Sequence, residues 1–186
     1  MATTTDIRKG IAVIHKGQTW VVIQAQFVSP GKGSAFTRVK LKCLTGGQTA
    51  EVTYKSGEAV ETADVQYRKC QYLYSDGTNY NFMDNDSFEQ FSLDKESIGD
   101  AVKLLKDGTE CHAMHIEGQA VSIQLPPKMD FKVTFAEPGV KGDSATGALK
   151  DCTIETGLTL KVPLFVNEGD IIKINTEDFA YVSKAN

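Results

Sequence analysis

The chain has 186 residues, of which 41% are hydrophobic, and carries a formal net charge of −4. No stretch approaches the roughly 18 consecutive apolar residues that a membrane span needs, and residues 1–10 lack the apolar segment of a signal peptide. These properties exclude a membrane partner and predict a cytoplasmic protein. The four cysteines contain no Cys-x-x-Cys pair, so in that compartment we expect four reduced thiols in the core or on the surface.

The charge is unevenly distributed along the chain. Residues 1–64 hold eight Lys or Arg against five Asp or Glu, a net charge of +3. Residues 65–127 have a net charge of −5 and residues 128–186 a net charge of −2. This asymmetry favours an N-terminal segment that meets a polyanion. Chance variation in surface charge would give the same numbers.

Short segments rich in β-branched and aromatic residues recur every 8–14 residues and are separated by Gly, Asp and Asn, a pattern typical of an all-β protein. Turn signals such as Lys16-Gly17, Gly46-Gly47 and Asp76-Gly77 lie between them. The expected strands are residues 10–15, 18–27, 35–44, 48–55, 66–75, 78–84, 110–117, 119–125, 129–136, 151–155, 158–161, 170–175 and 179–184.

One segment departs from the strand pattern. Between Asp94 and Leu105 the apolar residues recur at helical spacing, with Ser92 available as the N-cap and Gly108 just past the end. We therefore expect one short amphipathic helix in the middle of the chain.

Thirteen short strands are too many for one small barrel and divide into three groups. The first break lies in the polar stretch 61–65, and the second lies at Pro126-Pro127, where neither residue can donate to a sheet. The sequence thus predicts barrels at 1–64, 65–127 and 128–186. Barrels of about 60 residues have thin cores, so we expect them to pack against one another.

The loop Ser29-Pro30-Gly31-Lys32-Gly33-Ser34 lies between two expected strands, at a hairpin tip. Pro30 fixes one φ angle, while Gly31 and Gly33 permit positive φ on both sides of Lys32. Such a loop projects Lys32 into solvent, where it can enter a narrow cavity or be held by a modifying enzyme. The same composition is typical of an ordinary turn with a solubilising lysine. The sequence disfavours a phosphate-binding loop, because Gly33 follows the lysine and a strand follows the loop.

Beyond the loop, Arg38, Lys40 and Lys42 alternate with apolar residues, which puts three cations on one strand face. A basic strand beside a projecting lysine suits contacts with a phosphate backbone. Alternation is equally normal for a solvated face of a one-sided sheet.

Catalytic and metal sites receive little support. Cys111 and His115 would share a strand face about 13 Å apart at ~3.3 Å per residue, His112 would point the other way, and no second cluster offers the remaining donors of a zinc site. The paired carboxylates lie in turns, and neither Ser nor Cys has the context of a nucleophile. We expect a protein that binds and does not catalyse.

The segment from Phe27 to Lys40, with Pro30-Gly31-Lys32-Gly33 at its centre, resembles the tip of the elongation factor P family in its lysine-bearing bacterial form. Similar matches follow in the same order over nearly the whole chain. They are Tyr54–Glu58, Ala63–Val65, Tyr72–Gly77, Phe82–Asp84, Phe88–Gln90, Glu137–Gly147, Glu155–Gly157 and Val162–Asp170.

The resemblance implies a KOW-like barrel followed by two OB-like barrels, in an L-shaped arrangement similar in size to tRNA. It implies a translation factor that binds the ribosome between the P and E sites, beside peptidyl-tRNA and ribosomal RNA, and relieves stalling at consecutive prolines. Lys32 would carry a covalent extension, of the β-lysyl type as the first hypothesis, added by a modifying enzyme. No other cofactor is implied, and the ribosomal slot suits a monomer.

Two departures from the family pattern concern the C-terminal third. Where the family usually has arginines, this chain has Glu177 and Lys184, while Tyr181 is retained as an RNA-contact candidate beside Arg38, Lys40 and Lys42. Glu reverses the charge and Lys lacks the planar fork of arginine, so these two positions cannot make the RNA contacts that arginine would make. Residues 148–152 also differ, and nothing in the sequence explains that difference.

A rival function from another class is a generic single-stranded RNA-binding protein of the OB type. Such proteins combine a basic groove with stacking aromatic residues. Tyr72, Tyr74 and Tyr80 could supply the aromatic residues, but the net charge of −5 in their segment disfavours this function.

Overall fold

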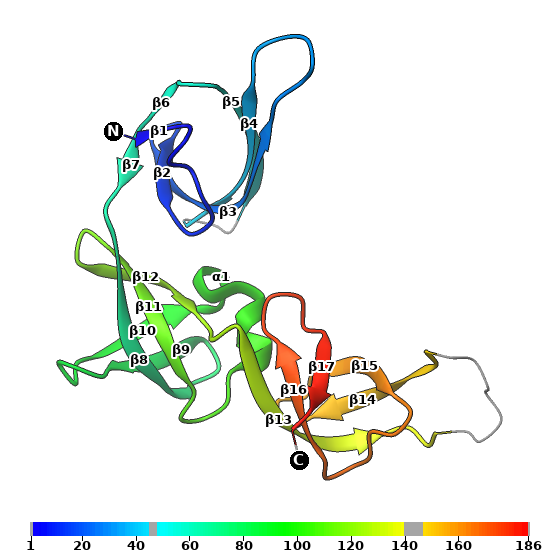
Figure 1. Cartoon of the computed structure of the whole chain (residues 1–186). Helices are drawn as coiled ribbons and strands as arrows, with labels where there is room; N and C mark the ends of the chain where they lie inside the picture. The colour runs from blue at the N-terminus through cyan, green and yellow to red at the C-terminus, as the bar shows by residue number, and fades with distance from the viewer. Residues whose placement is uncertain (1, 45–47, 140–146, 186) are drawn as a thin grey trace.

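The computed structural model describes residues 2–44, 48–139 and 147–185. Within these ranges the fold is almost entirely antiparallel β, with a short helical segment in the middle third (Figure 1). The strands form three five-stranded sheets, which follow one another along the chain and curl into three barrels. The all-β fold class expected from the sequence is confirmed. The Gly46-Gly47 turn and residues 140–146 of the family resemblance lie outside the described residues.

The first sheet has the order β5-β4-β3-β2-β7. Its strands are β2 (Ala12–His15), β3 (Gln18–Val28), β4 (Phe36–Cys43), β5 (Thr49–Lys55) and β7 (Thr62–Ala63), and a two-stranded ribbon of β1 (Ala2–Thr3) and β6 (Ala59–Val60) lies beside it. The buried side chains include Trp20, Val39 and Leu41. Since alternate residues of a strand face opposite sides, β4 points its apolar set inward and its cations outward.

The middle sheet has the order β10-β9-β8-β11-β12. Its strands are β8 (Val65–Ser75), β9 (Asn79–Asp84), β10 (Gln90–Asp94), β11 (Glu110–Ile116) and β12 (Gln119–Gln124). Phe82 lies at the centre of its core and stacks on Phe91 at 5.5 Å between ring centroids. Strand β10 was not expected from the sequence, because its five residues run directly into the helix and lack a turn signal between the two.

The helix expected over residues 94–105 is shorter and less regular than predicted. An α-helical turn, α1 (Lys95–Ile98), gives way to a 3-10 helix at Gly99–Leu104, and Gly99 has φ of +74°, which interrupts the α conformation. The expected N-cap was wrong. Asp94 accepts the Ser97 backbone N–H at 2.7 Å, while the Ser92 hydroxyl donates to Asn81 instead.

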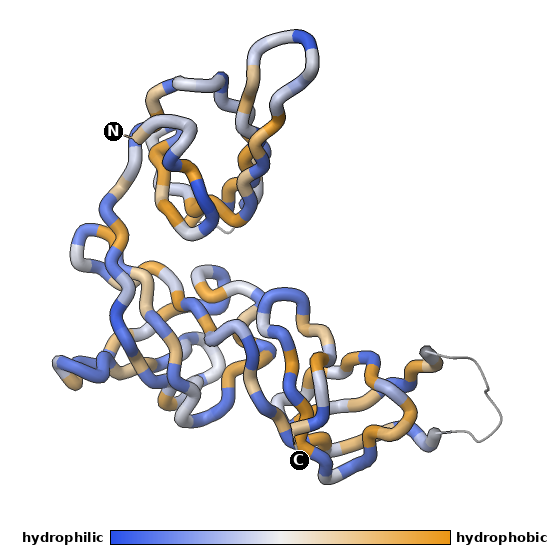
Figure 2. Tube along the Cα trace, viewed as in Figure 1, coloured by the Kyte–Doolittle hydropathy of each residue, from blue (hydrophilic) through white to orange (hydrophobic). Residues whose placement is uncertain are grey.

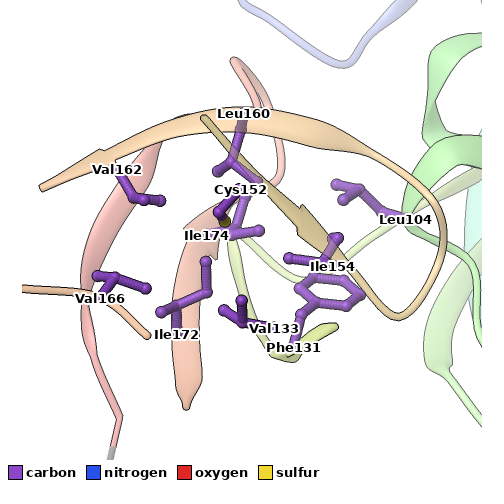
Figure 3. Close-up of a cluster of buried hydrophobic side chains, with 10 residues drawn as sticks. All are labelled: Leu104, Phe131, Val133, Cys152, Ile154, Leu160, Val162, Val166, Ile172 and Ile174. Carbon is purple, nitrogen blue, oxygen red and sulfur yellow. The ribbon is translucent and has the colours of Figure 1, made fainter. Parts of the chain in front are cut away.

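The third sheet has the order β15-β14-β13-β16-β17. Its strands are β13 (Lys128–Ala136), β14 (Leu149–Ile154), β15 (Thr159–Pro163), β16 (Ile171–Asn175) and β17 (Tyr181–Lys184). Figure 3 shows a cluster of buried side chains, most of them from these strands, with the Phe131 ring at one side beside Ile154 and Val133. Leu104 enters the same cluster from the 3-10 helix of the middle barrel, and it is fully buried there.

The middle and third barrels therefore meet through apolar packing. Leu125 packs against both cores. The Lys106 ammonium donates to the Asp130 carbonyl at 2.8 Å and lies 4.9 Å from the centre of the Phe131 ring. The Thr176 backbone N–H donates to the Pro127 carbonyl at 3.0 Å and so extends the β13–β16 ladder into the link between the two barrels. These contacts fix the third barrel against the middle one.

The first barrel is attached differently. The Tyr67 hydroxyl donates to the Gly10 carbonyl at 2.8 Å, and Lys9 forms an ion pair with Glu177 of the third barrel. Between the first and middle barrels lies a pocket of about 420 Å³, which residues of both barrels line. Figure 1 shows this barrel set at an angle to the other two, with the β3–β4 hairpin at its far end.

Candidate functional site

The loop between β3 and β4 is exposed from Ser29 to Ser34. Gly33 has φ of +110°, where a side chain would be strained, and the Pro30 ring lies across the loop near it. Gly31 does not adopt positive φ, so of the two glycines that permit this conformation only Gly33 uses it. Lys32 thus lies at the tip between Pro30 and Gly33, and within the described part of the chain its ammonium group has neither a hydrogen bond nor an ion pair. In Figure 2 this tip is among the hydrophilic parts of the trace.

A regular ladder carries the hairpin away from the barrel. Strands β3 and β4 pair from Trp20 opposite Cys43 to Val28 opposite Phe36, with a register shift between Val22 and Gln24. Such a bulge bends its strand and increases the local twist. The hairpin therefore projects beyond the barrel as an arm with Lys32 at its end.

The outer face of this arm is cationic near the tip. Arg38 and Lys40 are exposed on β4, as the alternation predicted, and the Arg38 guanidinium lies 6.0 Å from the centre of the Phe36 ring. Lys40 faces Glu51 of β5, which offsets part of its charge. No described carboxylate lies within ion-pair distance of Arg38 or Lys40, so both remain available to an anionic partner.

Sequence reasoning missed Lys55 as a member of this face. It is exposed at the end of β5 and lies opposite Phe36, next to the base of the loop. The missing information was the register of β5 against β4, which a single sequence does not give. Phe27, 64% exposed at the base of the loop, was also not singled out. The exposure of this apolar side chain is a property of the fold, so a single sequence offers no signal that would have identified it.

Lys42 does not belong with Arg38 and Lys40 in space. It lies at the barrel end of β4 and lines the pocket between the first and middle barrels. Its ammonium is so close to Gly99 that a β-carbon there would lie 2.7 Å from Nζ. Gly99 follows α1, and a cation near a helix C-terminus interacts favourably with the exposed carbonyl groups. The position of Lys42 thus indicates a contact between barrels.

Tyr181 is far from the tip in the fold, on β17 of the third barrel (Figure 1). Its ring is half-buried against the core of that barrel. Glu177, one of the departures from the family pattern, forms the ion pair with Lys9. The acidic residue at this position therefore has a structural partner within the chain. Lys184 pairs with Asp170 at 3.0 Å.

The other candidate groups lie apart from one another. His112 is exposed on β11, while Cys111 and His115 are buried. No group of three or more His, Cys, Asp or Glu residues suited to a metal ion occurs in the described ranges. Tyr72 is buried and packs against Tyr80, which leaves Tyr74, at 52% exposure, as the accessible member of that trio. The three tyrosines therefore do not form one exposed stacking surface.

Family comparisons match all three barrels in the same order as the fold. Residues 3–60 match the elongation factor P (EF-P) KOW-like domain, residues 65–123 the elongation factor P OB domain, and residues 129–184 the elongation factor P C-terminal domain. The chain belongs to the elongation factor P family. This membership makes it a translation elongation factor with KOW-like and OB domains, as the tip motif and its companions predicted.

Similar solved structures include a eukaryotic translation initiation factor 5A from Methanococcus jannaschii, at 22% identity and a TM-score of 0.49 over 67% of this chain and 90% of that one. Another is a translation initiation factor eIF-5A family protein from Naegleria fowleri, at 16% identity and a TM-score of 0.42 over 66% of this chain and 94% of that one. Similarity at this level decides nothing about the chain. Separately, the described residues include no helix long and apolar enough to cross a bilayer.

Proposed function

We propose that this elongation factor P family protein binds the ribosome between the P and E sites, beside peptidyl-tRNA, and relieves stalling at consecutive prolines. The observation that carries the proposal is Lys32, an unpaired cation at the end of a projecting hairpin with a basic face behind it. Residues 1–64 have a net charge of +3 and the other two segments are acidic. The polyanionic RNA would therefore meet the arm first.

The factor would act by ordering the substrate and would perform no catalysis of its own. Arg38, Lys40 and Lys55 would rest on the phosphate backbone of the P-site tRNA, which positions a protein without reading sequence. Lys32 would then lie along the acceptor end of the tRNA, where charge-assisted hydrogen bonds from a cationic side chain are strong. Since orientation can supply several kcal/mol of a barrier, such ordering would accelerate bond formation with a poorly reactive proline.

In this proposal Lys32 carries a covalent extension of the β-lysyl type, added by a modifying enzyme. The exposed tip supports it, because residues 29–34 offer a slender, accessible loop that an enzyme could enclose. An extension would lengthen the reach of the arm and keep a terminal cation. Mass spectrometry of the protein purified from its source cells would decide the matter. An unmodified Lys32 would contradict the extension.

The arrangement of the barrels supports the same site. The first barrel stands at an angle to the other two (Figure 1), which suits an L-shaped particle similar in size to tRNA. The factor would work in the cytoplasm as a monomer, because a slot between tRNA sites holds one such particle. Tyr181 of the third barrel, which is partly exposed, would contact RNA from its half-buried position.

Reconstituted translation of a Pro-Pro-Pro reporter tests the proposal directly. We expect modified native protein to relieve the stall and Lys32→Ala to fail, because the substitution removes the cation at the tip and leaves both strands intact. Lys16→Ala, which removes an exposed lysine from a distant turn, is the matched control and should retain full activity. If folded, modified native protein leaves the stall unchanged, the translation role is wrong and RNA binding becomes the better hypothesis.

The loop geometry offers a second, independent test. Gly33→Ala places a side chain at φ of +110°, so the loop must change shape. Gly31→Ala meets no neighbour within 4 Å and needs no such change. We expect Gly33→Ala to lower stall relief several-fold while Gly31→Ala remains close to native. Equal activity of the two variants would show that the loop conformation is unimportant.

A further inference from the structure

Two of the four cysteines lie directly opposite each other in the middle barrel. Cys70 on β8 and Cys111 on β11 are register partners in an antiparallel pair. Their sulfur atoms are 3.4 Å apart, and both side chains are buried in the core of the barrel. Both are free thiols, as are Cys43 and Cys152, which lie singly in the cores of the first and third barrels.

The backbone already has the geometry of a disulfide. Opposed residues in an antiparallel pair have α-carbons about 4.5–5.5 Å apart, within the range of about 4.4–6.8 Å that disulfides adopt. The sulfur atoms need to approach by about 1.4 Å to reach the bonded distance. Small side-chain rotations can supply this movement, since neither strand has to change register.

The two sulfur atoms are chemically unequal. Hydrogen bonding with Cys70 lowers the pKa of the Cys111 thiol, against the opposing effect of burial. The same hydrogen bond, together with burial and the nearby Asp84, raises the pKa of Cys70. Either thiol can donate this hydrogen bond; when Cys111 is the thiolate, the Cys70 S–H donates to its sulfur, and the thiolate is the nucleophile.

We propose that Cys70 and Cys111 form a redox modification site, in which hydrogen peroxide converts the facing thiols to a disulfide. The Cys111 thiolate attacks one peroxide oxygen, the O–O bond breaks, and protonation of the departing oxygen releases water. Cys70 then attacks the resulting Cys111 sulfenic acid, and a second water leaves. In total, two thiols lose two electrons and two protons, and one peroxide becomes two water molecules.

The bond would join β8, the central strand of the middle sheet, to its neighbour β11. It would close a loop that contains β9, β10 and the helical segment with Leu104. Because cross-linking restricts the unfolded chain, the oxidised protein should melt at a higher temperature than the reduced protein. The inference stands independently of the proposed function, since it rests on geometry inside the middle barrel.

The experiment uses the full-length, fully reduced protein treated with hydrogen peroxide in native buffer. After catalase removes the peroxide, the protein is denatured, alkylated and analysed by mass spectrometry. We expect the mass of two hydrogen atoms to be lost, Cys43 and Cys152 to be alkylated, and a Cys70–Cys111 cross-linked peptide that dithiothreitol separates. The two single cysteines are internal controls for burial, because they are as buried as the pair but have no sulfur partner. Alkylation of all four cysteines, or cross-links through Cys43 or Cys152, would overturn the proposal.

Two variants test the order of the steps. In Cys70→Ser, peroxide should leave a sulfenic acid on Cys111 that dimedone traps, because the second thiol is missing. In Cys111→Ser, Cys70 should remain unlabelled. Labelling of Cys70 at an equal rate would disprove the assigned roles. Circular dichroism checks that each variant is folded, and the native-protein experiment stands even if one variant is not.

Discussion

The two junctions between barrels differ in what holds them together. The middle and third barrels share apolar side chains, with Leu104 of one barrel fully buried in the core of the other. The first barrel is attached through polar contacts at the rim of a pocket, including the Tyr67 hydrogen bond and the exposed Lys9–Glu177 ion pair. Burial of apolar side chains stabilises a junction strongly, whereas an exposed ion pair stabilises it little. The second and third barrels therefore form one body, and the first barrel is attached to it more weakly.

The comparison predicts two unfolding transitions that different probes can separate. Trp20 is the single tryptophan of the chain and lies in the core of the first barrel, so its fluorescence reports that barrel. Far-ultraviolet circular dichroism reports all three barrels. A single coincident transition for both probes would show that the polar junction couples the barrels as strongly as the apolar one.

The largest expected effect comes from Leu104→Ala. It removes a fully buried side chain from the shared core and should lower the free energy of unfolding of the second and third barrels by about 2–5 kcal/mol. The Trp20 transition should move little. Leu149→Ala, at an exposed site of the third barrel, is the control and should stay within about 0.5 kcal/mol of native. Equal effects in the two variants would contradict the shared core.

Asp84→Ala should have the next largest effect, and it depends on pH. The buried Asp84 carboxylate accepts the backbone N–H groups of Asp86 and Ser87, which lowers its pKa from 3.8. We expect a loss of about 1.5–3 kcal/mol at neutral pH, measured by chemical denaturation.

The sign of the pH dependence follows from the lowered pKa. Asp84 stabilises the folded state fully above pH 3.8, and this contribution is lost as the pH falls through the lower folded-state value. The difference between native protein and Asp84→Ala should therefore shrink in acid, while the effect of Leu104→Ala should not. Asp86→Ala, an exposed carboxylate in the same turn, is the control.

Tyr67→Phe removes the hydrogen bond from the middle barrel to the Gly10 carbonyl. We expect the Trp20 transition to shift by about 0.5–1.5 kcal/mol, a typical net value for one such bond. Tyr74→Phe changes an exposed tyrosine on the same strand and should leave the transition unchanged. A shift of several kcal/mol in Tyr67→Phe would mean that the first barrel is held to the middle one more firmly than its contacts indicate.

The smallest effect on stability is expected for Lys9→Gln, because both partners of its ion pair are more than half exposed. The free energy of unfolding should change by less than about 1 kcal/mol. Small-angle X-ray scattering should nevertheless show a wider range of shapes than for Lys16→Gln, which removes the same charge from the exposed β2–β3 turn. Identical scattering curves would show that the ion pair does not restrain the first barrel.

The sequence correctly predicted those features of the fold that depend on local residue pattern. Alternation assigned the inward and outward faces of β4 correctly, and the Pro-Gly-Lys-Gly motif predicted an exposed lysine at a hairpin tip. It could not distinguish Lys42 from Arg38 and Lys40, because the position of the middle barrel beneath the end of β4 depends on tertiary packing. Helical spacing around Leu104 likewise does not say which barrel buries that side chain.

The shared core also has a consequence for biosynthesis. When the middle barrel first leaves the ribosome during its own synthesis, Leu104 has no complete cavity to enter, because the strands of the third barrel that line it have not yet emerged. A nascent chain stopped after residue 127 would present an apolar side chain at the surface and favour aggregation. The first barrel, whose core contains residues from its own strands, can complete its folding earlier. The chain thus folds in two stages: the first barrel, which carries the Lys32 loop, folds first, and the other two barrels fold together later.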